Sequence, residues 1–499
     1  MIIAGRGFKS ISDGLRFLAK PAGFAMLLVI SLVFAYVIKS LQIKGAAIIF
    51  ILMMGPPIAF GIIAKPKFGI TVLLIAAYLI MWVLRMNLVD FPLGTLMDAL
   101  LALLIAGLFI QLKYRPDWSF LSSPISIMIG IWIIYNFILV ANPVAQSKMA
   151  WLYTIRSMAI VMLTYFIFSY HIRDIKFIRL IIKLWLGLSL FAAAFGFKQQ
   201  FIGFFAYEEA YLYSDPLIMD LLFINGVWRK FSIFSDPTAF SYNMILSSLL
   251  CIGLMFSPIS NFKKFILGCM TLFFLTNMLF SGTRSAYVLL PASLIMLTIL
   301  VFNKKILIAS SAAGMIMALL IFMPTSNPAL YRFQTAFKPS DDASFNVRAR
   351  NQKMIQPYIW THPIGGGLGS TGVWGAKFSP GSFLASFPPD SGYVRVAVEM
   401  GWIGLFLFCL LLFMILKTGI SNYFKILDPE LKSYCLAMVL MVYALTIGNY
   451  PQEAITQYPL NVYFFLVAAL INATYQLDKE KRELSALEGS TIKSNSRYN

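Results

Sequence analysis

Histidine, cysteine and acidic residues are scarce in this sequence of 499 residues. The only histidines are His171 and His362, which excludes a metal site built from several imidazoles. The first predicted outer loop, "KSLQIK", contains no carboxylate, so Asp341 and Asp342 alone leave a carboxylate-bound metal open. We therefore expect no metal and no other cofactor. The four cysteines lie in apolar segments without metal-ligand spacing, as expected of packing residues: Cys251, Cys269, Cys409 and Cys435.

Charged residues of either sign are also few. They make up 12% of the chain, against about 25% in soluble globular proteins, while 59% of the residues are hydrophobic and the mean hydropathy is +0.79. A membrane-spanning helix needs roughly 20 apolar residues. About fourteen stretches approach that length, although Gly55-Pro56-Pro57 interrupts one of them, so twelve spans are the alternative. The sequence predicts an all-α, polytopic membrane helix bundle.

Lysine and arginine are unevenly distributed between the predicted loops. If the N-terminus is cytoplasmic, the inner loops hold most of these residues, including Lys65/Lys67, Lys263/Lys264 and Lys304/Lys305. Both termini are then cytoplasmic, and the protein lies in the cytoplasmic (inner) membrane. The net charge of +19 reflects this bias together with attraction to anionic membrane lipids, and does not indicate nucleic-acid binding.

This topology divides the chain into seven regions. The outer face has only two substantial loops, where we expect the functional residues. The regions are a cytoplasmic amphipathic N-terminus (1–20), helices 1–7 (21–203), an outer loop (204–236), helices 8–11 (237–323), a large outer, periplasmic loop (324–392), helices 12–14 (393–476) and a polar cytoplasmic tail (477–499), which we expect to end without regular structure.

The larger loop contains two distinct patterns. In "NVRARNQKMIQPYIW", Met354, Ile355, Tyr358 and Ile359 form one helical stripe, which predicts a helix. The following "THPIGGGLGSTGVWG" permits tight turns. It lacks the lysine of a nucleotide-binding phosphate loop. We predict that this glycine run packs closely against a helix or against a lipid-linked substrate.

Arginine beside aromatic and hydroxyl residues marks the predicted outer face. Arg229 lies in "GVWRKFSIFSDPTAF", Arg284 in "SGTRSAYVLL", and Arg348 and Arg350 in the larger loop. The planar guanidinium matches phosphate oxygens in pairs, so such a cluster suits a lipid diphosphate. A snorkelling side chain or a salt bridge is the alternative for each arginine.

Arg156 lies within a predicted membrane helix, "WLYTIRSMAIVMLTYF". A charge there is costly and is therefore either functional or paired. Asp90 and Asp98 are the possible partners. In "PPDSGYVRVAVEMGWIG", Arg395 and Glu399 are four residues apart, which predicts an ion pair.

Four stretches together resemble the O-antigen ligase and Wzy-type polysaccharide polymerase family, over roughly residues 225–405. "RKFSIFSDPT" is similar to its Arg-x-x-Gly-x-Phe-x-x-Pro-Asn stretch, with Ser232 and Thr238 departing from it. "SGTRSAY" resembles its Ser-Gly-Ser/Thr-Arg turn, and "RARNQKMIQPYIWTHPIGGGLG" its arginine, helix and Pro-x-x-Gly-x-Gly stretch. "DSGYVRVAVEMGWIG" resembles the motif that closes Glu-x-Gly-x-x-Gly.

The resemblance implies a membrane glycosyltransferase of the GT-C type that acts on the outer face. Its donor would be an undecaprenyl-diphosphate-linked oligosaccharide. Ligases transfer the glycan to lipid A core, whereas polymerases transfer it to another lipid-linked repeat unit. Ligases typically begin the last motif with histidine, and Asp390-Ser391 here favours a polymerase. A ligase remains the first alternative and a lipid-linked oligosaccharide flippase or transporter the second. A chain-length regulator is a candidate partner.

Residue roles follow as expectations. Arg284 would stabilise the leaving diphosphate, and Asp390 would act as the base for the acceptor hydroxyl. The main alternative for Asp390 is that it serves only as a helix N-cap. The predicted diphosphate- and substrate-binding residues are Arg229, Arg348, Arg350, Arg156 and Tyr393.

Overall fold

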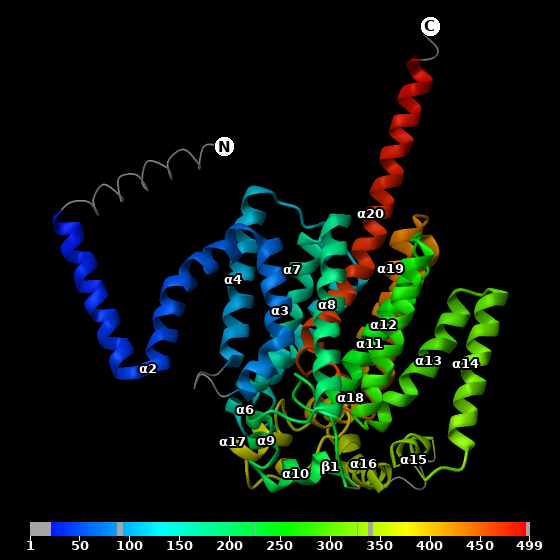
Figure 1. The fold of residues 1–499 in the computed structure, drawn as a ribbon. Coiled ribbons are helices and arrows are strands. Elements are labelled where there is room, and N and C mark those ends of the chain that lie inside the picture. Colours follow the sequence, from blue (N-terminus) through cyan, green and yellow to red (C-terminus); the bar gives the residue numbers. More distant parts are fainter. Residues whose placement is uncertain (1–20, 87–92, 225, 327, 338–342, 496–499) are drawn as a thin grey trace.

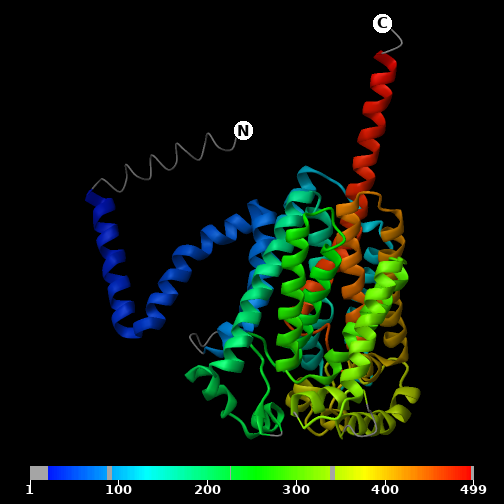
Figure 2. The same ribbon diagram turned by 45° about the vertical axis from the view of Figure 1, so that its right-hand side comes forward.

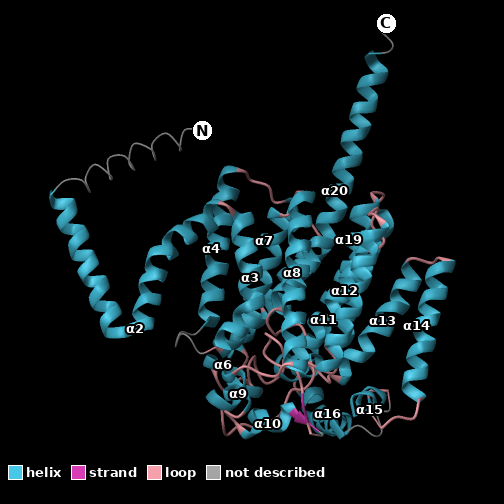
Figure 3. Ribbon diagram, viewed as in Figure 1, coloured by secondary structure: helices cyan, strands magenta, loops and turns pink. Residues whose placement is uncertain are grey.

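A computed structural model describes residues 21–86, 93–224, 226–326, 328–337 and 343–495. The predicted amphipathic N-terminus, Asp90, Asp341 and Asp342 lie outside these ranges. The described chain is almost entirely helical, so the predicted all-α membrane bundle is confirmed (Figure 3). The helices of the bundle are α2 (Pro21–Ala64), α3 (Pro66–Arg85), α4 (Leu93–Tyr114), α5 (Pro124–Ile138), α6 (Lys148–Met158), α7 (Leu163–His171), α8 (Ile175–Phe201), α11 (Pro237–Leu254), α12 (Asn261–Phe280), α13 (Arg284–Leu300), α14 (Lys304–Phe322), α18 (Gly392–Lys425), α19 (Pro429–Gly448) and α20 (Leu460–Asn495), of which α6 and α7 together make one span.

The described residues contain twelve helices that are long and apolar enough to cross a membrane. Two shorter apolar helices, Leu52–Ala64 and Arg284–Leu300, account for the other stretches expected from hydropathy. Leu52–Ala64 is the end of α2, which changes direction at Gln42, where φ is 49°. The count of fourteen and the alternative of twelve thus differ only by these two short helices.

Helices α11 and α19 form the centre of the bundle. In an 18-residue apolar stretch of each helix, 89% of the α11 residues and 78% of the α19 residues are buried. Small residues allow the two helices to approach closely, since a Cβ at Gly253 would lie 2.4 Å from the Cβ of Ala437. By contrast, the first arm of α2 and the whole of α14 lie at the periphery (Figures 1 and 2). No residue is buried in the apolar stretch of either helix.

Both long connections lie at one end of the bundle, here called the loop end (Figure 1). The C-terminal part of α20 projects from the opposite end. The polar tail continues α20 as helix to Asn495, and its last residues, 496–499, at which we expected regular structure to end, lie outside the described ranges. The loop end is built from α9 (Ala206–Leu212), α10 (Pro216–Leu222), β1 (Phe223–Ile224), β2 (Val227–Trp228), α15 (Pro328–Thr335), α16 (Ala343–Thr361), α17 (Gly372–Phe378) and the 3₁₀ helix η5 (Phe383–Ser386).

Helix α16 confirms the helix expected from the apolar stripe of the larger loop. Ile355 is fully buried and contacts a small apolar cluster with Leu384, Phe387 and Val398, against which Tyr358 and Ile359 also pack. Met354 is the exception, because its side chain is 52% exposed. The stripe therefore anchors α16 to α18 and η5 at the loop end.

Candidate functional site

Four of the predicted charged residues line one cavity at the loop end, although they are far apart in the sequence. This arginine cavity has a volume of about 490 Å³. Arg229, Arg284, Arg348 and Asp390 all contribute to its wall. The other lining residues are Asp220, Leu221, Ile224, Thr238, Gly282, Thr283, Ser285, Val347 and Gln452.

The turn between α12 and α13 positions Arg284. Gly282 has φ +59°, a left-handed conformation that glycine adopts without a steric cost. The Ser281 hydroxyl accepts a hydrogen bond from the Thr283 N–H at 3.1 Å, and Thr283 Oγ1 donates to the carbonyl of Pro237 at 3.2 Å. Arg284 is then the first residue of α13. The Arg284 guanidinium therefore lies at the N-terminus of a 17-residue helix, next to the N–H groups of its first turn. This combination favours the binding of an anion.

Arg229 supports this turn directly. Its Nε donates to the carbonyl of Ser281 at 3.0 Å, and its Nη2 donates to Thr283 Oγ1 at 3.0 Å. Its Nη1 also donates to the carbonyl of Leu221 at 3.3 Å. Arg229 therefore both lines the cavity and holds the turn that carries Arg284.

Ser232 occupies the glycine position of the first motif, and its backbone shows why glycine suits that position. Its φ is +53°, which costs a residue with a Cβ about 1–2 kcal/mol. Hydrogen bonds compensate: Ser232 Oγ donates to the carbonyl of Ala192 at 2.6 Å, and the Ser232 N–H donates to Gln199 Oε1 at 2.8 Å. The departure from the family pattern is thus accommodated locally.

Arg85 also supports the first motif, and the sequence analysis did not identify it. Its guanidinium donates to the carbonyls of Ser232 and Ser235, at 3.1 and 3.2 Å, and to that of Phe234. It also stacks on the ring of Phe231, 4.2 Å from the ring centroid. A basic residue at the end of an apolar helix was the available signal, but position alone does not indicate which loop it contacts.

The glycine run packs against protein, which is one of the two predicted outcomes. Its N–H groups pair with the last motif: Gly366 donates to the carbonyl of Val398 and Gly367 to that of Glu399, both at 2.9 Å. A Cβ at Gly369 would lie 2.3 Å from Thr154 Oγ1, against α6. Gly401, with φ +70°, leaves no room for a Cβ beside the carbonyl of Pro363. The third and fourth motifs therefore interlock through their backbones.

The predicted ion pair between Arg395 and Glu399 is confirmed, with Arg395 Nε 3.2 Å from Glu399 Oε1. Glu399 is fully buried and also accepts from the Gly369 N–H at 2.9 Å and from Thr371 Oγ1 at 2.5 Å. Glu453 is a third member that the sequence did not reveal, with Oε2 2.5 Å from Arg395 Nη1. Burial raises the pKa of the Glu453 carboxyl, while Arg395 acts in the opposite direction. This charged group anchors the glycine run to α18.

Asp390 is not the N-cap of α18, so the interpretation of this residue as a cap is wrong. The cap is Ser391, whose hydroxyl accepts from the Val394 N–H at 3.4 Å. Asp390, one residue earlier, is exposed and lines the arginine cavity. Asp390 therefore shares the wall of this cavity with the arginines.

The remaining predicted residues lie elsewhere. Arg156 forms an ion pair with Asp98, so of its two predicted interpretations, functional or paired, the structure supports the second. Tyr393 donates from its hydroxyl to the carbonyl of Thr446 at 2.7 Å, within the bundle. Arg350 is exposed on α16 and does not line the arginine cavity. Within the described ranges, no three histidine, cysteine, aspartate or glutamate side chains are grouped so that they could hold a metal ion.

Comparison with known proteins finds a family match over part of the chain. Residues 269–409 match the sequence model of the O-antigen ligase family. The matched range begins in α12 and ends in α18, so it includes Arg284, Arg348 and Asp390. A search of curated proteins found no match. The resemblance seen in the motifs is confirmed for residues 269–409, and this match supports a membrane enzyme of the O-antigen ligase or polymerase type.

Proposed function

We propose that this protein is a polysaccharide polymerase. It transfers an undecaprenyl-diphosphate-linked glycan to the terminal sugar hydroxyl of another lipid-linked repeat unit, on the outer face of the inner membrane. The observation that carries this proposal is the arginine cavity, in which Arg284, Arg229 and Arg348 share a wall with Asp390. The cavity joins positive charge for a diphosphate to a carboxylate that can accept a proton.

The chemistry divides between these residues. The acceptor hydroxyl oxygen forms a bond to the anomeric carbon of the donor as its proton passes to the Asp390 carboxylate. The bond between that carbon and the diphosphate oxygen breaks, and the electron pair leaves with the diphosphate. Arg284 and the N-terminus of α13 stabilise the charge that develops there. Arg348 and Arg229, which line the same cavity, orient this diphosphate.

The arginines supply the positive charge that a leaving diphosphate needs, so we propose that the transfer does not depend on a metal ion. Purified protein in nanodiscs should retain its turnover in excess EDTA. Loss of turnover in EDTA, restored by Mg²⁺ or Mn²⁺, would contradict this part of the proposal.

Asp390 is the feature that favours a polymerase over a ligase, because it stands where the ligases of this family present histidine. Deleting the gene and analysing the lipid-linked intermediates tests the choice. A polymerase defect leaves single repeat units on the carrier and on the surface. A ligase defect leaves long chains on undecaprenyl diphosphate, and a flippase defect leaves units trapped on the cytoplasmic side. Either of the last two results would overturn the proposal.

A further inference from the structure

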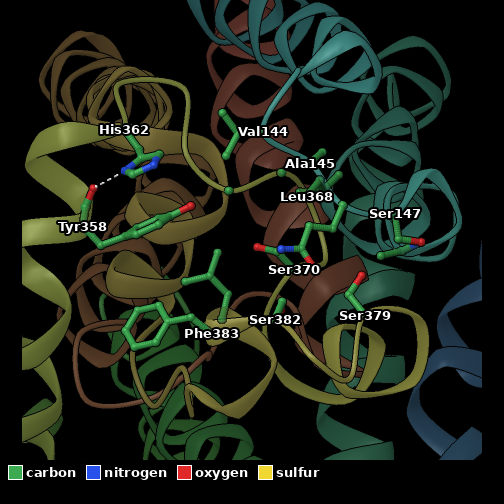
Figure 4. A pocket seen from close by; sticks show the side chains of 15 residues that line it. Val144, Ala145, Ser147, Tyr358, His362, Leu368, Ser370, Ser379, Ser382 and Phe383 are labelled. Atoms are coloured by element: carbon green, nitrogen blue, oxygen red, sulfur yellow. Dashed lines mark hydrogen bonds between the residues drawn. The ribbon is translucent and has the colours of Figure 1, made fainter.

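A second pocket lies at the other end of α16 and differs in chemistry from the arginine cavity. It has a volume of about 180 Å³, or the space of roughly six water molecules. Figure 4 shows side chains from α16, the glycine run, the segment before η5 and the start of α6 around it. We call it the serine pocket, because Ser147, Ser370, Ser379 and Ser382 line it.

The serine pocket offers hydrogen bonds without charge. Among the residues that the structure describes, none of those lining it is an aspartate, glutamate, lysine or arginine. Ser370 Oγ is buried and has no hydrogen-bond partner among the described residues. A buried hydroxyl without a partner costs about 1–3 kcal/mol, so this atom is suited to a ligand that bonds to it. An anionic group has no counter-charge here.

Aromatic rings complete the pocket. Tyr358 and His362 are stacked, with ring centroids 3.9 Å apart and planes 11° apart, and Phe383 lies beside Tyr358. His362 Nδ1 is 2.9 Å from the carbonyl of Tyr358. In a neutral ring Nδ1–H donates to this carbonyl, which leaves Nε2 as an acceptor. Hydroxyls that donate and accept, beside flat apolar rings, match the polar edge and apolar face of a sugar.

Helix α16 connects the serine pocket to the arginine cavity. Arg348 lines the cavity and Tyr358 lines the pocket, ten residues further along the same helix. At 1.5 Å per residue, their backbones are about 15 Å apart along the helix axis. Burial of Ile355 between them fixes the helix on α18 and η5. One rigid element thus holds both sites at a constant separation.

We propose that the serine pocket is a saccharide subsite that holds one uncharged sugar ring, away from the diphosphate in the arginine cavity. This inference rests on the proposed function. The sugar belongs either to the acceptor repeat unit or to the far end of the donor glycan. Both sources present the same hydroxyl-rich, uncharged ring to the pocket.

Direct binding tests the subsite. The probe is the repeat-unit oligosaccharide released by mild acid from the lipid-linked intermediate, added to the full chain in nanodiscs and measured by calorimetry. The double substitution Ser370→Ala and Ser379→Ala should weaken binding about tenfold, as for the loss of one or two net hydrogen bonds. Lys353→Gln, at an exposed position of α16 that lines neither cavity, is the matched control and should bind as the wild type. Absence of wild-type binding, or wild-type affinity in the double variant, would overturn the inference.

Turnover measurements distinguish the two sources. If the pocket holds the acceptor, the double variant raises the KM for acceptor and leaves that for donor unchanged. If it holds the donor glycan, the reverse is expected, and unchanged values for both contradict the inference. The binding experiment does not require transfer, so a deletion strain that retains normal polymer would refute the proposed function while leaving the saccharide subsite to be judged on binding.

Discussion

The arginine cavity and the serine pocket lie at the two ends of α16 and recognise different chemistry. The first is larger, about 490 Å³, and charged, whereas the second, about 180 Å³, is lined by hydroxyls and rings. A lipid-linked saccharide has both a diphosphate and uncharged sugars, so we propose that the two sites divide one substrate between them. On this proposal, the charged site positions the reacting bond, whereas the uncharged site contributes only binding.

The largest effect is expected at Arg284. Arg284→Ala should abolish polymer, with turnover reduced at least about 10²-fold, because removing one preorganised donor costs about 3 kcal/mol of barrier. Surface glycan on gels and turnover in nanodiscs are the measurements. Saccharide binding in the serine pocket should be unchanged, which separates the two sites. Normal chain length in this variant would contradict the diphosphate role.

Asp390→Asn should lower turnover by about 10²-fold, because an amide cannot accept the hydroxyl proton. Its thermal unfolding should match the wild type, since Ser391 caps α18. Ser391→Ala is the matched control: it should lose about 1 kcal/mol of stability and keep most of the turnover. Full turnover in Asp390→Asn would remove the base from the mechanism.

Glu399→Gln should lower the stability of the protein more than it lowers the rate of the transfer reaction. Glu399 is buried and accepts from Arg395, Gly369 and Thr371, and breaking a buried pair costs about 3–5 kcal/mol. The loop that forms the serine pocket should loosen, so saccharide binding should fall more than diphosphate binding. Thermal unfolding and calorimetry with the oligosaccharide and with inorganic diphosphate provide the comparison. Equal losses for both ligands would show that the two sites are not independent.

The smallest effect is expected at Ser232, behind the arginine cavity. Ser232→Gly relieves the positive φ but removes the hydrogen bond to Ala192. These terms offset each other, so we expect a stability change within about 1 kcal/mol. Ser232→Ala keeps the Cβ and loses the bond, and should therefore be the less stable of the two. Thermal unfolding of the pair measures the difference, and the reverse order would contradict it.

Local patterns in the sequence predicted the bundle and four of the residues that line the arginine cavity. Hydropathy located the apolar helices because burial in lipid requires apolar length. The stripe of α16 predicted a helix because its periodicity reflects one packed face. Arg229, Arg284, Arg348 and Asp390 could be selected because charged residues at a membrane edge are rare. The ion pair between Arg156 and Asp98 was one of the alternatives predicted from the sequence.

Tertiary structure alone decided the contacts between distant segments. Glu453 joins Arg395 across 58 residues, and Arg85 reaches the carbonyls of the first motif from another helix. The N-cap of α18 is Ser391 and not Asp390, because the helix begins at Gly392, one residue later than a cap at Asp390 requires. The serine pocket has no sequence signature, because serine hydroxyls and a stacked ring pair are too common to stand out. Charge and hydropathy are properties of residues, whereas a pocket is a property of the space between them.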